Sequence, residues 1–264
     1  MAGTVTTEER GAVATVRFDN REKRNALGPP LLAKLVDALE ELEDRDGIRT
    51  VVLTGAGEAA FSAGFDISYH QRNYGEGPAE SEEPEAEFTD LTDLVKAFDY
   101  PVVAMINGGT YGGAMHLAAA CDLRVAVEDA RFGITPAKLG LVYGGEAIHE
   151  VMIHVGPANV KEFLFTAEFV DAERAYDMGF LNRVVPREKL EETTYDLAES
   201  MASNAPLSLT GMKRIVRALV DHGALTDAER AWAQELRDQA EASYDHQEGV
   251  EAFMEDREPE FEGR

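Results

Sequence analysis

Residues 107–122 read NGGTYGGAMHLAAACD, and this stretch is the most informative part of the sequence for the fold. Two pairs of glycines precede an alanine-rich run, which predicts a turn leading from a strand into a helix near Gly113. Gly112 and Gly113 have no side chain, so another molecule can come close to their backbone. The first N–H groups of a helix have no partner within it and lie at the positive end of its dipole. The pattern therefore fits a site that stabilises an oxygen gaining negative charge, and it also fits an ordinary glycine-rich turn.

A second segment of matching character lies upstream. Residues 50–67 read TVVLTGAGEAAFSAGFDI, a buried apolar strand followed by a glycine turn and then FSAGFD. Together with FDNREKRNAL at 18–27 and PVVAMINGG at 101–109, these segments resemble the crotonase (enoyl-CoA hydratase/isomerase) superfamily. The resemblance runs from about Val13 to EGVEAFMEDREPEF at 248–261, which is nearly the whole chain.

The order of the predicted elements indicates an α/β fold. Strands alternate with helices in the first part of the chain, which predicts parallel strands joined by right-handed crossovers, and the pattern from Gly156 onward is nearly all helical. The resemblance implies a core of repeated ββα units wound into a spiral, expected over residues 1–198 with the CoA and oxyanion site. Residues 199–264 are expected to form a helical region through which family members form trimers or hexamers.

Three local predictions can be stated as residue ranges. Leucines at helical spacing predict an amphipathic helix within 25–46, whose first turn suits the Pro29–Pro30 pair. The run 69–87 is rich in Gly, Pro and Glu and poor in apolar residues, which predicts a mobile acidic loop. Near the end of the chain, a single long helix is expected over 227–245.

The net charge is −25, with 50 acidic and 25 basic residues. Self-repulsion on this scale disfavours a compact state at low ionic strength and is screened when the Debye length shrinks to about 3 Å near 1 M salt. A halophilic cytoplasm explains the charge, and an acidic protein from an ordinary cell is the alternative. The charge disfavours nucleic acid and anionic membranes as partners.

No apolar run reaches the roughly 18 residues that span a bilayer, and the first residues, MAGTVTTEER, lack a signal pattern. A cytoplasmic protein is expected. The single cysteine, Cys121, lies in an apolar helical run and is interpreted as a small core residue.

The resemblance implies that a thioester carbonyl of an acyl-CoA binds between two backbone amides. By motif position these are the amides of Phe65, which follows A-G in FSAGFD, and of Gly113, the second glycine of the turn. Hydratases of the superfamily also use two glutamates, at the positions that His116 and Pro136 occupy here. Both carboxylates are absent, which argues against an ordinary two-glutamate hydration.

Two other side chains are candidates for the chemistry. His116 lies one helical turn after Gly113, on the same helix face, where the dipole favours the neutral imidazole as a base or donor. Tyr143 lies in LGLVYGGEA, where flanking glycines would let it face a cavity. A core histidine and a packing tyrosine are the alternatives.

The segment T-P-x-x-L-G-x-x-Y, from Thr135 to Tyr143, resembles the methylmalonyl-CoA decarboxylase branch of the superfamily. That branch has a histidine where this chain has Phe65 and usually a glutamate where it has His116. Three functions remain open: an acyl-CoA lyase that decarboxylates a malonyl-type thioester, an enoyl-CoA hydratase or isomerase that uses His116, and a CoA-binding scaffold with weak or no catalysis.

The resemblance also implies substrate-binding positions, with coenzyme A as part of the substrate and no separate cofactor or metal. Asp66 is a candidate both for a substrate contact and for a helix cap. The full set of implied substrate-binding residues is Arg21, Lys23, Asn25, Ala26, Leu27, Ala63, Asp66, Ile67, Thr135, Phe253 and Arg257.

Overall fold

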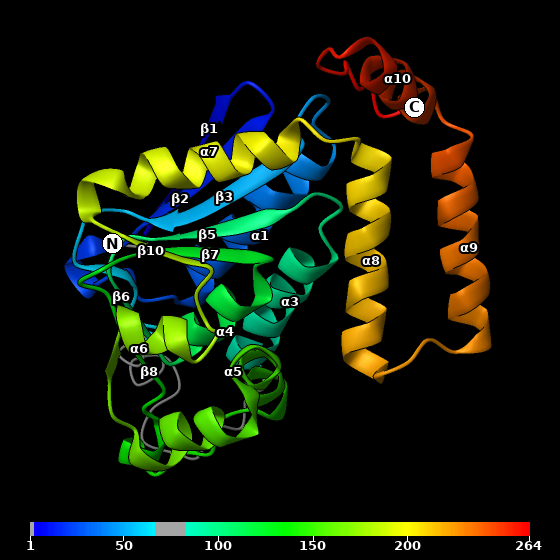
Figure 1. The fold of residues 1–264 in the computed structure, drawn as a ribbon. Coiled ribbons are helices and arrows are strands. Elements are labelled where there is room, and N and C mark those ends of the chain that lie inside the picture. The colour runs from blue at the N-terminus through cyan, green and yellow to red at the C-terminus, as the bar shows by residue number, and fades with distance from the viewer. Residues whose placement is uncertain (1–2, 67–82) are drawn as a thin grey trace.

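The structure is a computed structural model that describes residues 3–66 and 83–264. A six-stranded sheet runs through the body of the molecule in the order β1-β2-β3-β5-β7-β10 (Figure 1). β1 and β2 pair antiparallel, and the other neighbours in this sheet pair parallel. Its strands are β1 (Thr4–Arg10), β2 (Val13–Asp19), β3 (Thr50–Gly55), β5 (Val102–Ile106), β7 (Leu123–Val127) and β10 (Arg183–Val185).

A smaller sheet has the order β4-β6-β8-β9. Its strands are β4 (Ala60–Ser62), β6 (Gly109–Tyr111), β8 (Arg131–Gly133) and β9 (Val170–Asp171). The helices are α1 (Pro29–Glu43), α3 (Glu83–Ala97), α4 (Gly113–Ala120), α5 (Gly145–Thr166), α6 (Ala172–Asp177), α7 (Leu190–Ala202), α8 (Pro206–His222), α9 (Asp227–Glu241) and α10 (Tyr244–Glu255), with short 3-10 turns η1 (Arg21–Lys23), η2 (Pro136–Leu139) and η3 (Arg187–Lys189).

The chain visits the two sheets in turn. Each of β3, β5 and β7 in the large sheet is followed by a strand of the small sheet, β4, β6 or β8, and then by α3, α4 or α5. Because β3-β5-β7 and β4-β6-β8 are both parallel sets, each ββα unit stacks on the one before it. The predicted spiral of ββα units is confirmed.

The predicted first helix is α1, which begins with the two prolines and buries the leucine stripe Leu31, Leu32, Leu35, Leu39 and Leu42. α1 packs against β1 and β2, and α7 packs against β2, β3, β5 and β7. No helix in the described part of the chain is long and apolar enough to cross a membrane.

One local prediction is wrong, and a second is wrong over the part that the structure describes. The predicted helix 227–245 ends at Glu241, because the Ser243 side chain accepts a hydrogen bond from the His246 amide (3.1 Å) and starts a new helix, α10. The predicted loop 69–87 overlaps α3, which already begins at Glu83. Residues 69–82 of that loop lie outside the described residues, so the rest of this prediction is not tested.

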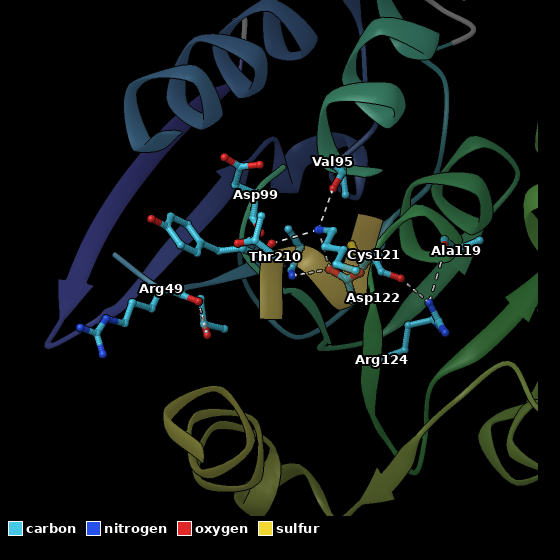
Figure 2. A network of polar contacts seen from close by, with 12 residues as sticks. Arg49, Val95, Asp99, Ala119, Cys121, Asp122, Arg124 and Thr210 are labelled. Carbon is cyan, nitrogen blue, oxygen red and sulfur yellow. Dashed lines mark hydrogen bonds and ion pairs between the residues drawn. The ribbon is translucent and has the colours of Figure 1, made fainter. Parts of the chain in front are cut away.

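The helices α8 and α9 stand side by side next to the body formed by the sheets (Figure 1). Polar contacts tie α8 to the body. Lys213 Nζ donates to the Tyr100 carbonyl (2.9 Å) and pairs with Asp122 (2.8 Å), while the Thr210 hydroxyl donates to the Asp99 carbonyl (2.9 Å) (Figure 2). The division of the chain between 198 and 199 stays a prediction.

Candidate active site

Two sharp backbone bends meet in the structure. Gly64 follows β4 with a φ of +81°, and Gly112 follows β6 with a φ of +54°. Residues other than glycine rarely adopt these backbone conformations. A Cβ atom on Gly64 would stand 2.9 Å from the Gly113 nitrogen. The segments that the sequence analysis paired therefore lie against each other.

The amides of Phe65 and Gly113 donate no hydrogen bond within the described residues. Phe65 forms a parallel bridge with Leu27, but that bridge uses the Gly64 carbonyl (2.7 Å) and the Asp66 amide (2.9 Å), which leaves the Phe65 amide directed away from Leu27. Gly113 is the first residue of α4, where an N–H has no acceptor within the helix. Two unpaired donors thus lie on adjoining segments.

These donors open onto a cavity of about 460 Å³. Ala63, Phe65, Gly113, His116, Thr135 and Tyr143, six of the predicted site residues, line it. Pro136 lines it as well, so both positions that hold glutamates in hydratases face the cavity without a carboxylate. The remaining wall is largely apolar.

Tyr143 fixes the glycine turn. Its hydroxyl donates to the Gly112 carbonyl (2.8 Å), one residue before the unpaired amide of Gly113. Burial raises the pKa of Tyr143 well above its usual value, and a hydrogen bond with the backbone of His116 opposes only part of that shift. The hydroxyl is therefore a neutral donor whose proton is already committed to the backbone.

His116 is 4% exposed, and its Nε2 atom is buried without a hydrogen-bond partner in the described residues. Its ring centroid lies 5.5 Å from that of Phe88, which in turn lies 4.7 Å from that of Phe65. Burial, helped by the positive charge of Lys96, lowers the pKa of His116 to about 4. Burial, and not the helix dipole on which the sequence analysis relied, therefore keeps the imidazole neutral at pH 7.

The sequence analysis missed Glu146. This residue lies in the first turn of α5, is exposed to solvent and lines the cavity. In the sequence, Glu146 follows Tyr143 and two glycines in YGGE, a pattern that carries no catalytic signal of its own. Without a structure, nothing distinguished it from the other acidic residues of the chain.

Several residues implied in substrate binding do not line the cavity. Lys23 forms an ion pair with Asp66, and the helix that Asp66 was expected to cap lies outside the described residues. Arg21 is exposed and pairs with Asp19 (2.9 Å). The Asn25 side chain is buried and donates hydrogen bonds to the carbonyls of Ala56 and Ala60 (both 2.9 Å). Its role is therefore structural.

The other implied positions are placed as follows. Ala26 and Leu27 are buried with the core. Phe253 and Arg257 come from α10 and the turn after it, Phe253 is 85% exposed, and Arg257 is held by Glu248 (2.6 and 2.9 Å). Ile67 lies outside the described residues.

The far end of α4 is fixed by one buried arginine and one histidine. Arg124 is 3% exposed and donates to the carbonyls of Cys121 (2.6 Å) and Ala118 (3.2 Å) at the end of the helix (Figure 2). His154 Nε2 lies 3.0 Å from the Ala119 carbonyl, and burial lowers the pKa of His154 to about 4. The helix that carries the Gly113 amide is therefore fixed at both ends, by Tyr143 and by these two side chains.

Comparison with known proteins gives one consistent family. The family model for enoyl-CoA hydratase/isomerase matches residues 8–264. Methylmalonyl-CoA decarboxylase of Escherichia coli is 34% identical over 95% of both chains, and crotonyl-CoA hydratase of Syntrophomonas wolfei is 31% identical over 96% of both. The crystal structure of an enoyl-CoA hydratase from Bacillus anthracis aligns over the whole of both chains with a TM-score of 0.92 at 27% identity. The chain belongs to the enoyl-CoA hydratase/isomerase family, the crotonase superfamily.

Proposed function

We propose that this protein is an acyl-CoA lyase that holds a thioester enolate between the amides of Phe65 and Gly113, and that its reaction is decarboxylation of a malonyl- or methylmalonyl-type CoA. The observation that carries the proposal is the pair of unpaired amides on adjoining glycine bends, beside a cavity whose two hydratase positions hold His116 and Pro136. The likeness to methylmalonyl-CoA decarboxylase supports the reaction type.

Decarboxylation suits these groups. When the bond to the carboxylate breaks, its electron pair moves into the thioester, and the developing charge falls on the carbonyl oxygen. Amide donors fixed before the reaction stabilise that charge, and each such donor is typically worth about 10²–10³ in rate. The phenyl rings of Phe65 and Phe88 make one wall apolar, which favours loss of the charged carboxylate as neutral CO₂.

Hydration or isomerisation of an enoyl-CoA is the second candidate. Its support is the neutral imidazole of His116 in the cavity wall and the likeness to crotonyl-CoA hydratase. In that reaction His116 would act as the base, so His116→Ala should lower activity by about 10²–10⁴, the range for general acid–base catalysis. In decarboxylation the same substitution should cost far less. A CoA-binding scaffold without turnover is the remaining alternative.

The decisive variants are at Gly113. Gly113→Pro removes the N–H at the first helical position, which tolerates proline. Gly113→Ala is the matched control, because its Cβ meets the Phe65 ring at 3.2 Å just as that of proline would, yet it keeps the N–H. Both variants are assayed in molar KCl with malonyl-CoA, methylmalonyl-CoA and crotonyl-CoA, and their folding is checked by circular dichroism.

We expect Gly113→Pro to lose at least about 10² in turnover relative to Gly113→Ala. Equal activity of the two variants would show that the Gly113 amide takes no part in the mechanism. A wild-type protein that binds CoA thioesters but turns none of them over would favour the scaffold.

We also propose that copies of this chain associate through exposed apolar side chains of the C-terminal helices. α8 exposes Met212, Val216 and Leu219 on one side, and α10 exposes Phe253 and Met254. Apolar surface of this kind is suited to contact between copies of the chain, and we propose a trimer or hexamer formed through the C-terminal helices.

A further inference from the structure

We propose that Glu146 is the proton-transfer residue of this site: it takes up a proton when a malonyl-type thioester binds and delivers it to the α-carbon of the enolate after CO₂ has left. The inference deepens the proposed function and rests on it. It assigns a catalytic part to a residue of α5 that lies outside both hydratase glutamate positions.

Position is the first support. Glu146 is the second residue of α5 and lines the same cavity as Phe65 and Gly113. Among the cavity-lining residues that the structure describes, it is the only carboxylate. Gly144 and Gly145 precede it, and a Cβ on either would meet none of the described residues within 4 Å.

The other two titratable groups among the described residues of the wall are poorly suited to the task. The hydroxyl proton of Tyr143 is directed to the Gly112 carbonyl, and its raised pKa keeps it there. His116 is neutral, with a pKa of about 4, and carries no second proton to give near pH 7. We therefore assign the protonation of carbon to Glu146, the third titratable group among the described residues of the wall.

In the proposed reaction, the charge of the substrate drives the uptake of the proton. The substrate brings its own carboxylate into a cavity that already holds that of Glu146, and two neighbouring carboxylates disfavour ionisation of both. Glu146 then takes a proton from solvent. The C–C bond of the substrate breaks, its electron pair forms the thioester enolate at the two amides, and CO₂ leaves. The α-carbon takes the proton of Glu146, whose carboxylate is restored, so one solvent proton is consumed for each CO₂ released.

The same residue must also act in reverse. The carboxylate of Glu146 should remove an α-proton from the saturated product thioester, so propionyl-CoA in D₂O should exchange its α-protons for deuterium on the enzyme. This exchange needs the amides and the base but no decarboxylation. It can be followed by NMR in molar KCl for the wild type and its variants.

The variants are Glu146→Gln, Glu146→Asp and a matched control, Glu173→Gln. Glu173 is an exposed carboxylate in the first turn of α6 and is not among the described residues that line the cavity. We expect Glu146→Gln to lose at least about 10² in both decarboxylation and α-proton exchange while keeping its affinity for propionyl-CoA. Glu146→Asp should recover part of both rates, and Glu173→Gln should equal the wild type.

Wild-type exchange and turnover in Glu146→Gln would overturn the assignment of Glu146 and leave the proposed function standing. A loss of affinity that accounts for the whole loss of turnover would make Glu146 a binding residue and overturn it as well. If the wild type itself shows neither exchange nor turnover, the proposed function fails, and the part assigned to Glu146 fails with it.

Discussion

His116 is a neutral side chain in a protein that carries 50 acidic residues. A strongly negative protein should raise the pKa of a histidine, yet the pKa here falls to about 4. Burial outweighs the distant charges because solvent-exposed carboxylates are screened beyond about 10 Å at 0.1 M salt, whereas the cost of charging a buried imidazole is local. Lys96, the nearby cation, acts in the same direction as burial.

Tyr143→Phe tests the turn at the residue scale. The substitution removes the hydrogen bond to the Gly112 carbonyl and leaves the ring in place. We expect a loss of about 1 kcal/mol in the free energy of unfolding, the usual net value of one hydrogen bond, and a fall in kcat of about tenfold because the Gly113 amide is no longer held in one orientation. Denaturant titration and steady-state kinetics measure the two effects, and an unchanged kcat would show that the hydroxyl has no part in placing the turn.

Part of this site could be predicted from the sequence because it consists of backbone groups whose conformation requires glycine. Two glycine bends at Gly64 and Gly112 can be recognised as a pattern, and the structure brings them together. Glu146 could not be recognised, because a carboxylate becomes a site residue only through what faces it in space. The same holds for Lys23 and Asp66, whose ion pair joins residues 43 positions apart.

At the scale of elements, α4 is buried along its whole length, from Gly113 to Ala120. A helix that is apolar all round belongs in a core. The carbonyls of its last turn have no partner within the helix, so they need hydrogen-bond donors from elsewhere in the protein. Arg124 supplies them, so the guanidinium at one end of α4 helps to fix the amide at the other.

Arg124→Met should therefore be strongly destabilising. It removes hydrogen bonds to the carbonyls of Ala118, Cys121 and Phe180 and leaves them buried without those donors. At about 1–3 kcal/mol for each buried group that loses its partner, we expect a loss of at least about 3 kcal/mol in the free energy of unfolding. Arg214→Met is a suitable control, because Arg214 pairs with Asp99 at the surface. A loss no larger than that of the control would contradict the capping role of Arg124.

Two histidines next to α4, the buried His116 and the half-buried His154, predict a pH dependence. Folding lowers the pKa of His116 and of His154 to about 4, from the usual value of 6.5. Between these values the unfolded chain binds protons that the folded chain does not, so stability is full above pH 6.5 and falls as the pH drops toward 4.

The size of this effect is up to about 3 kcal/mol for each histidine. Glu248 contributes at lower pH only, because its ion pair with Arg257 lowers its pKa to about 2 from 4.5. Denaturant titrations at pH 7.5 and 5 should show the loss, and His154→Gln should reduce it. Equal stability at the two pH values would show that neither histidine is buried neutral.

At the scale of the whole molecule, the excess of acidic residues sets the conditions under which the fold is stable. The net charge of −25 predicts that thermal stability and oligomer size rise steeply between about 0.1 M and 2 M KCl as the Debye length shortens. Melting curves and light scattering across this range measure both. A melting temperature that is insensitive to KCl would remove the halophilic interpretation.

The order of elements could be predicted over the whole molecule, whereas their ends could not. Alternating strands and helices predicted parallel pairing, and the resemblance to the crotonase superfamily implied the spiral of ββα units. The break between α9 and α10 depends on one serine cap, at Ser243, within an otherwise continuous helical pattern. The start of α3 at Glu83 falls in an acidic, proline-containing run whose composition favours a loop.

Cys121, the only cysteine of the chain, makes this molecule suitable for thiol-labelling kinetics. Its thiol is buried at the end of α4, donates to the Leu117 carbonyl (3.4 Å) and has a pKa that burial raises to about 12. A reagent such as an aromatic disulfide attacks the thiolate, so labelling should occur only when the region around α4 opens. We expect very slow labelling of the native protein and much faster labelling of Arg124→Met under the same conditions, as read from the released chromophore. Rapid labelling of the native protein would show that the end of α4 opens without global unfolding.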